Sequence, residues 1–264
     1  EYAIDIIGNK DLGEYTTTDG ASFRDALLAR SLTVSSVKRI FSSVRSIVNL
    51  TLKEHGLRAT NPFAGTYMPE EVNAKKRTPF PEDSLIKIQK LCRRHDDDLR
   101  WLVSLISDTG MRLGEACGLK VADIELDAEI PCVHIRPNEA RRLKTTSSER
   151  TIPLVGEALW AASQAVKHST GEFLFPRYTK LGKANSNSAS AALNKWLRTH
   201  APEGCVIHSF RHSMRDRLRA IECAKDTVDQ IGGWAAGSIG ESYGDGYPIA
   251  VLNKWLELAT SQCR

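Results

Sequence analysis

The sequence predicts a mainly α-helical protein with a small antiparallel β-sheet, an α+β fold preceded by a small helical domain. Apolar residues recur every three or four positions through most of the 264-residue chain, as they do on the buried faces of helices. Between residues 122 and 154 the pattern changes to short apolar runs around a polar turn, which is typical of strands and a hairpin. A segment at about 60–77 with prolines, basic residues and little periodicity indicates a linker, and we place the domains at 1–72 and 73–264.

The composition is that of an ordinary globular protein. Apolar residues make up 41% and charged residues 26% of the chain, and no apolar run approaches the ~18 residues that would indicate a membrane span. A net charge of +4 permits a polyanionic partner without requiring one. The six cysteines form no CxxC pair, so we expect buried, reduced thiols and a cytoplasmic protein. Because the chain begins with neither Met nor a signal peptide, we expect it to be an N-terminally truncated piece of a longer protein.

Two helices are expected in the first domain. One lies within residues 21–31. The second begins after Thr33, which is suited to cap it, and ends near Gly56, because glycine tolerates the left-handed conformation at a helix end. Its apolar stripe consists of Val34, Val37, Ile40, Phe41, Val44, Ile47 and Val48.

The other face of this second helix is basic and polar. Its charged residues are Lys38, Arg39 and Arg45. Such a face is usually only solvated. It becomes a candidate DNA-binding face, with contacts to phosphates, if the neighbouring domain acts on DNA.

The second domain is expected to be helical around one region of strands. We expect helices at 81–94, 97–110, 113–118, 188–200, 208–222, 227–234 and 250–260, and strands within 122–137, 141–154 and 172–176.

Arg112 and Glu115 lie at the start of the short helix expected at 113–118. An arginine fixed at a helix junction can present its N–H donors to a phosphate, and a carboxylate three residues later is close enough to support it. A surface arginine with a local ion pair would explain the same pattern.

Lys144 lies beside the polar turn of the 141–154 hairpin. A lysine at this place could move to a leaving oxygen and give it a proton. In isolation, a solubilising lysine is the simpler explanation.

His208 and Arg211 are three residues apart, so both project from one face of the helix expected at 208–222. Their side chains are suited to bind two oxygens of one phosphate. His208 and His212 also have a spacing found at zinc sites. However, the sequence lacks a third ligand and the glutamate of an HExxH motif, so we expect no metal there.

Trp234 follows two glycines, and Tyr243 comes nine residues later in a glycine-rich segment. The indole N–H can donate a hydrogen bond, and a phenol can act as a covalent nucleophile where cationic neighbours favour its phenolate form. Tyr247 is the alternative nucleophile, but it precedes Pro248 and is therefore biased toward an extended turn. A loop aromatic would be an ordinary explanation for either tyrosine.

The order Arg, Lys, His-x-x-Arg, Trp and Tyr between residues 112 and 243 resembles the tyrosine recombinase family, often called phage integrases. The motifs that carry the resemblance are TGMRLGE, LKTTSSERTIPL, HSFRH and GGW followed by Tyr at plus nine. Residues 1–72 resemble the helical core-binding domain of the family more loosely. The fold implied is the tyrosine recombinase catalytic fold, preceded by that small DNA-binding domain.

The resemblance implies roles for the cationic residues. Arg112 and Arg211 would clamp the scissile phosphate, and Glu115 would support the first of them. Lys144 would be the general acid toward the 5′ oxygen. His208 would match the histidine of the His-x-x-Arg pair.

The resemblance also assigns the two aromatic residues. Tyr243 matches the nucleophile, and Tyr247 departs from the spacing of the family. Trp234 falls where most members carry histidine, although some carry tryptophan. We therefore expect Trp234 to donate a hydrogen bond and pack, without moving protons.

The implied activity is cleavage and rejoining of DNA through a 3′-phosphotyrosyl intermediate, with no metal, ATP or other cofactor. The implied partners are double-stranded DNA, further copies of the chain as a tetramer on paired sites, and accessory DNA-bending proteins, without a membrane. The implied location is the cytoplasm of a bacterial or phage-infected cell.

Three alternatives stay open. A type IB topoisomerase uses a similar set of residues to relax supercoils, and a DNA-binding module could have lost catalysis. A metal-dependent nuclease is disfavoured, because Asp123, Glu125 and Asp127 alternate as on an exposed strand edge and lack the other residues of a calcium loop.

Overall fold

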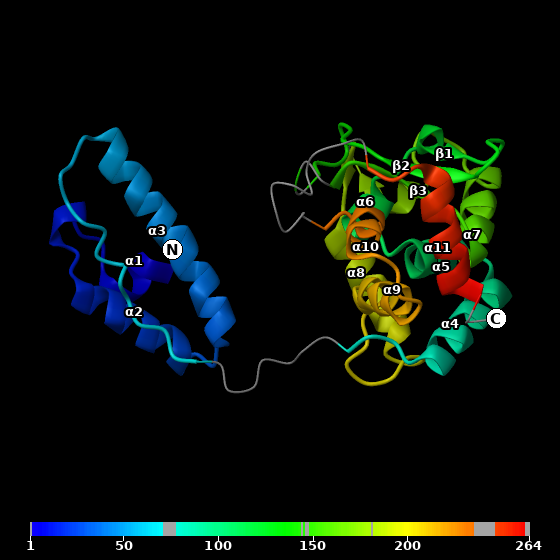
Figure 1. The fold of residues 1–264 in the computed structure, drawn as a ribbon. Coiled ribbons are helices and arrows are strands. Elements are labelled where there is room, and N and C mark those ends of the chain that lie inside the picture. Colours follow the sequence, from blue (N-terminus) through cyan, green and yellow to red (C-terminus); the bar gives the residue numbers. More distant parts are fainter. Residues whose placement is uncertain are drawn as a thin grey trace. The chain divides into compact units, whose positions relative to one another are not determined.

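The computed structural model describes residues 2–70, 78–143, 145, 148–180, 182–234 and 246–261. The chain divides into two compact units, Glu1–Lys76 and Arg77–Arg264 (Figure 1). The expected mainly helical fold with a small antiparallel sheet is confirmed. Two of the expected site residues, Lys144 and Tyr243, lie outside the described residues. None of the helices described is both long enough and apolar enough to cross a membrane.

The first unit contains helices α1 (Tyr2–Ile7), α2 (Thr17–Ala29) and α3 (Val34–Glu54), with a 3-10 turn η1 at Leu12–Glu14. Its caps follow the sequence: the Thr33 side chain accepts a hydrogen bond from the Ser36 N–H at 3.2 Å. Gly56 has a φ of +61° just after α3, as expected for the residue that ends a helix. The core of this unit consists of Ile7, Phe23, Leu27, Val37, Phe41, Val48 and Phe63.

The two faces of α3 differ from the expectation at two residues. Ile47, predicted to be part of the apolar stripe, is 65% exposed, because it lies off the line of Val37, Phe41 and Val48 that faces α2. Arg45 is only partly exposed, and its Nε donates to the Phe63 carbonyl at 2.8 Å. Lys38 and Arg39 are exposed as expected.

Helices make up most of the second unit (Figure 1). They are α4 (Glu82–His95), α5 (Asp98–Thr109), α6 (Leu113–Cys117), α7 (Gly156–Lys167), α8 (Ser186–Leu197), α9 (Ser209–Ala220), α10 (Lys225–Gly232) and α11 (Ile249–Ser261). Helix α5 is central, since all its residues from Trp101 to Thr109 are buried and it packs against α4, α7, α9 and α11. Gly110 ends it with a φ of +64°, so the chain turns directly into the Arg112 segment.

A three-stranded antiparallel sheet in the order β1-β2-β3 lies against these helices. The strands are β1 (Ile124–Glu125), β2 (Cys132–Ile135) and β3 (Arg150–Pro153). Val133, Ile135 and Ile152 belong to the hydrophobic core, so this side of the sheet faces the helices. A second, two-stranded sheet joins β4 (Thr179–Lys180) to β5 (Lys183–Ala184).

Two sequence expectations are wrong. Residues 172–176 do not form a strand: Phe173 makes an isolated bridge to Lys120, and a 3-10 turn η4 follows at Pro176–Tyr178. Asp123 does not lie on an exposed strand edge. It ends a 3-10 turn η2 (Val121–Asp123), is 1% exposed and accepts a hydrogen bond from Arg136 Nε at 2.7 Å.

Cysteines in the described residues are buried and unpaired, as predicted. They are Cys92, Cys117, Cys132, Cys205 and Cys223.

Candidate phosphate-binding site

Three arginines converge on the C-terminal end of helix α10. Arg150 Nε donates to the Ile231 carbonyl at 2.9 Å, and Arg211 Nη1 donates to the next carbonyl, that of Gly232, at 2.6 Å. Arg112 Nη2 donates to the Gly233 carbonyl at 2.9 Å. The last carbonyls of a helix have no partner within it and carry the negative end of its dipole, so this end of α10 collects cations from three other elements.

Arg112 reaches this point from the residue just before α6, where Glu115 holds it. The guanidinium Nη1 of Arg112 donates to Glu115 Oε1 at 2.6 Å, and the Arg112 backbone N–H donates to Glu115 Oε2 at 2.9 Å. The Arg112 side chain is still 24% exposed, whereas that of Glu115 is 6% exposed. The structure thus brings together the pair that the sequence singled out and leaves the arginine accessible.

Arg150, at the start of β3, is a site residue that the sequence reasoning missed. Its Nη2 donates to Glu115 Oε2 at 2.9 Å, and its side chain is 4% exposed. In the sequence, only its place within the LKTTSSERTIPL motif pointed to Arg150. Its partner Glu115 lies 35 positions away, so no local spacing links the two residues.

Glu115 is therefore a buried carboxylate shared by two arginines. Burial raises the pKa of the Glu115 carboxyl, but the charge and hydrogen bond of Arg150, with the hydrogen bonds from Arg112, outweigh it and hold this pKa below its usual value. The carboxylate is charged at neutral pH and orients both guanidinium groups.

Arg211 comes from the first turn of α9 and is 4% exposed. Its Nη1 also donates to the Gly110 carbonyl at 2.8 Å, so it links the ends of α5 and α10. Burial, together with the charges of Arg112 and Arg150, lowers the pKa of Arg211 to about 9. In the described part of the chain its Nη2 is buried and has no hydrogen-bond partner.

Trp234 stacks on this cluster. The guanidinium carbons of Arg211 and Arg215 lie 4.1 Å and 4.8 Å from the centroid of its ring system. The two preceding glycines make this possible: a Cβ on Gly232 would lie 1.7 Å from Trp234 Cζ3, and Gly233 has a φ of +62°.

His208 immediately precedes α9, and its ring lies 5.3 Å from that of His212 in an edge-on arrangement. Among the described residues, no third His, Cys or carboxylate ligand atom joins the two histidines in a group that could hold a metal ion. His208 belongs to the same turn as Arg211, as the sequence predicted.

The hairpin predicted within 141–154 is not what the described residues form, because the strand there, β3, pairs with β2 and Arg141 makes only an isolated bridge to Asn138. The segment before β3 is nevertheless tied to Arg112. Ser148 is fully buried, and its Oγ accepts from Arg112 Nη1 at 3.2 Å. Thr145 Oγ1 lies 3.0 Å from Ser148 Oγ. The neighbour of Lys144 in the chain is thus linked, through one serine, to the arginine cluster.

The charges of this site do not balance. Arg112, Arg150 and Arg211 bring three guanidinium groups to one carboxylate, that of Glu115. A largely buried excess of positive charge favours the binding of an anion, and guanidinium groups match the oxygens of a phosphate.

Comparison with known proteins gives one family. The family model described as "Phage integrase family" matches residues 80–247. Tyrosine recombinase XerC of Vibrio vulnificus (strain YJ016) is 25% identical over 233 residues, which cover 80% of this chain and 67% of that protein. The XerC of Xanthomonas campestris pv. campestris (strain B100) is 28% identical over 216 residues, covering 79% of this chain and 62% of that protein. The chain thus spans about two thirds of the length of these relatives.

Solved structures share the fold. The Tn1549 transposon integrase in complex with transposon right end DNA has a TM-score of 0.64 at 16% identity, covering 92% of this chain and 86% of that one. A lambda integrase tetramer bound to a Holliday junction has a TM-score of 0.60 at 18% identity, covering 89% of this chain and 66% of that one.

Proposed function

The chain belongs to the phage integrase family of tyrosine recombinases, and we propose that its arginine cluster holds the scissile DNA phosphate while Tyr243 attacks it. The observation that carries this proposal is the set of three arginines gathered around Glu115 and the end of α10. Such fixed donors stabilise the charge that develops on phosphorus, and the loss of one typically costs about 3–4 kcal/mol in the transition state.

The contacts support different roles for the three arginines. Arg112 is partly exposed and Arg211 has a buried nitrogen without a partner in the described residues, so these two are the phosphate ligands. Arg150 is fully engaged by Glu115 and two carbonyls, so it is a positioning residue. His208 and Trp234 add donors from the same turn and the adjoining segment.

In the proposed reaction, the Tyr243 phenol loses its proton to solvent, its oxygen forms a bond to phosphorus, and the bond from phosphorus to the 5′ oxygen breaks. Lys144 gives the proton that the leaving 5′ oxygen takes up. The products are a 3′-phosphotyrosyl link and a free 5′-hydroxyl, which then attacks the phosphotyrosyl bond of a partner strand. One phosphate ester replaces another of similar energy, so the cycle needs no ATP, and the cationic side chains take the place of a metal.

The proposed partners are double-stranded DNA and three further copies of the chain on paired sites, with accessory DNA-bending proteins. Support for the assembly comes from the solved relatives, one of which is a lambda integrase tetramer on a Holliday junction. Helix α11 packs on its own unit through Leu252, Leu256 and Ala259. The proposed location is the cytoplasm of a bacterial or phage-infected cell.

The experiment that tests this function separates recombination from the topoisomerase alternative. The chain is incubated with plasmids that carry repeats from the DNA flanking its own gene, with EDTA and without ATP. We expect exchange of strands between two such sites. Relaxation of supercoils without exchange would instead indicate a type IB topoisomerase, and binding with no covalent adduct would indicate a DNA-binding module. A strict requirement for Mg²⁺ would contradict the mechanism.

A further inference from the structure

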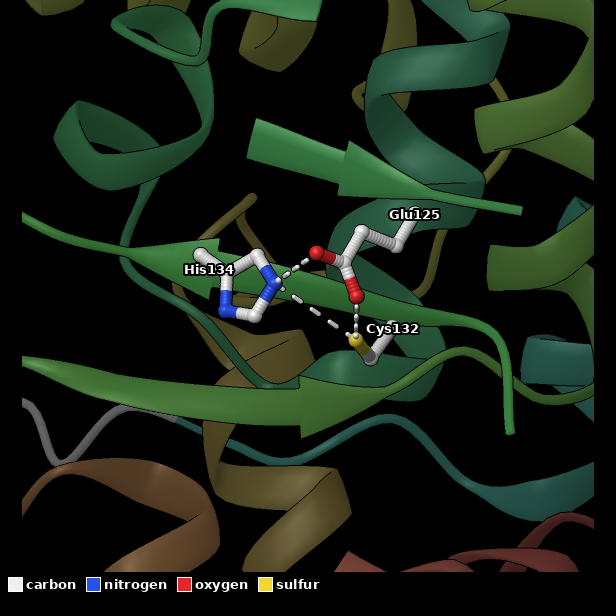
Figure 2. Close-up of side chains that lie close together, drawn as sticks. All are labelled: Glu125, Cys132 and His134. Atoms are coloured by element: carbon white, nitrogen blue, oxygen red, sulfur yellow. Dashed lines mark hydrogen bonds and ion pairs between the residues drawn. The ribbon is translucent and has the colours of Figure 1, made fainter. Parts of the chain in front are cut away.

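A second group of reactive side chains lies on the sheet, away from the arginine cluster. Glu125 on β1 and Cys132 on β2 are direct partners in the antiparallel register. His134 is two residues further along β2, so its side chain is on the same face as that of Cys132. Figure 2 shows the three side chains converging on one point above the sheet.

One possible ligand atom from each of the three residues lies within 4.8 Å of the other two, and closer pairs involve both oxygens of Glu125. His134 Nε2 lies 3.3 Å from Glu125 Oε1, and Cys132 Sγ lies 3.7 Å from Glu125 Oε2 and 3.8 Å from His134 Nε2. Tetrahedral zinc, with bonds of about 2.0–2.3 Å, keeps its ligand atoms about 3.3–3.6 Å apart. A rotation of the partly exposed Glu125 carboxylate would therefore bring one of its oxygens, the Cys132 sulfur and His134 Nε2 onto one ion.

The orientation of His134 is set by a residue of the third strand. Its Nδ1 lies 2.9 Å from Thr151 Oγ1, and Thr151 is its direct partner across β2 and β3. A hydrogen bond from Nδ1–H to the hydroxyl leaves Nε2 with a lone pair directed at Glu125 and Cys132. Histidines that bind metals are held in the same way by a partner on their other nitrogen.

We propose that Glu125, Cys132 and His134 form a binding site for Zn²⁺. A thiolate, an imidazole and a carboxylate together are a ligand set that zinc prefers over magnesium or calcium. The thiol proton of Cys132 leaves to solvent when the ion binds. Cys132 is 3% exposed, but the Glu125 and His134 side chains are 56% and 27% exposed, so the ion can enter from solvent and keep water as its fourth ligand.

The ion would act on the fold rather than on DNA. Thr151 faces His134, whereas the preceding residue, Arg150, points to the opposite face of the sheet and binds Glu115. Strand β1 pairs through only two residues. Zinc would stabilise the pairing of β1 with β2. Through the contact between His134 and Thr151 it would also stabilise β3, the strand that positions Arg150. The inference does not depend on the proposed DNA chemistry.

The same contacts also have an explanation without metal. The Cys132 thiol can donate to Glu125, and Glu125 can pair with a protonated His134. The two explanations differ in what happens when a metal ion is added.

The test uses the whole chain, free of any histidine tag and stripped of metal by a chelator. Cobalt(II) is added and followed by absorption, and zinc is then titrated against a chromophoric chelator. We expect one ion per chain, a thiolate-to-cobalt charge-transfer band that zinc abolishes, and a higher Tm with zinc. Absence of the band in the wild-type chain would overturn the proposal.

Variants assign the ligands. Cys132→Ser should remove the charge-transfer band, whereas Cys223→Ser, a matched change at another buried thiol, should keep it. Glu125→Gln and His134→Gln alter partly exposed residues, so they test the site even if Cys132→Ser does not fold. Thr151→Val should weaken zinc affinity by about 10–100-fold, as the loss of a residue that orients a ligand usually does. Each ligand variant should weaken it more. Zinc binding by Glu125→Gln and His134→Gln with wild-type affinity would overturn the site.

Discussion

Arg211 shows how one residue can be both structural and poised for an anion. A guanidinium that is 4% exposed is costly to bury unless hydrogen bonds and counter-charge compensate. The Gly110 and Gly232 carbonyls satisfy Nη1, while the Glu115 carboxylate is engaged by Arg112 and Arg150. A phosphate oxygen at Nη2 would supply the missing partner. Such an anion would offset the burial and the neighbouring arginine charges that lower the pKa of Arg211.

Glu115 leads to a prediction about pH. Its pKa in the folded chain lies below the unfolded value, so its stabilising effect is present above about pH 4.5 and is lost as the pH falls through the folded pKa. Glu115→Gln removes this titration. We expect the free energy of unfolding, from urea denaturation at each pH, to fall less steeply for the variant than for the wild type between about pH 6 and about pH 3.

Glu203→Gln is the control, because Glu203 is exposed in the loop before α9. It should leave the wild-type pH profile almost unchanged. Parallel profiles for the wild type and Glu115→Gln would show that the arginines do not hold this carboxylate in its charged form.

At the scale of elements, the end of α10 organises the site. The carbonyls of Ile231, Gly232 and the following Gly233 each accept from a different arginine, and the two glycines let Trp234 fold back over Arg211. In Gly232→Ala, the new Cβ would fall within the indole ring and force Trp234 off the cluster. We expect covalent adduct formation on a nicked suicide substrate to slow by about 100-fold, the usual scale for a displacement of about 1 Å.

Gly171→Ala is the matched control, since a Cβ there meets nothing within 4 Å. It should cleave at the wild-type rate. If Gly232→Ala, checked for folding by circular dichroism, also cleaves at that rate, the position of Trp234 does not matter for the reaction.

Most helices could be predicted from the sequence because the spacing of their apolar residues shows which face is buried. The periodicity and caps of α3 and α5 give their bounds to within a few residues. Helix α7 was missed because its buried residues are four alanines, which give little apolar contrast. The strand expected at 172–176 failed because a short apolar run does not distinguish a strand from a single bridge.

The site could be predicted only where its partners are close in sequence. Arg112 and Glu115 are three residues apart, and His208 and Arg211 are in one turn. Arg150 depends on Glu115, 35 residues away, and the cluster of Glu125, Cys132 and His134 depends on the strand register. The spacing of residues in one sequence does not predict such contacts, because residues far apart in the chain come together only in the folded structure.

At the scale of the whole molecule, the question is whether the first unit binds DNA. Lys38 and Arg39 are exposed neighbours on α3, whereas Arg45 is held by the Phe63 carbonyl and is the weaker candidate. If Lys38 and Arg39 each neutralise a phosphate, changing both to Ala should weaken binding of the core site. The slope of log affinity against log salt should fall by about 0.9 for each phosphate that is no longer neutralised.

The control changes Lys87 and Lys90, exposed lysines on α4, to Ala and so alters the net charge equally. Affinity is measured by fluorescence anisotropy at several salt concentrations. Equal weakening in the two double variants would assign the effect to net charge and not to the α3 face.

The measurement that most directly tests the central claim is the trapping of covalent DNA on a nicked suicide substrate. Wild-type chain and Tyr247→Phe should each form an adduct, with Tyr243 in the peptide that carries the nucleotide. Tyr243→Phe should form none while binding the same DNA. An adduct that survives in Tyr243→Phe and disappears in Tyr247→Phe would contradict the assignment of the nucleophile on which the proposed mechanism rests.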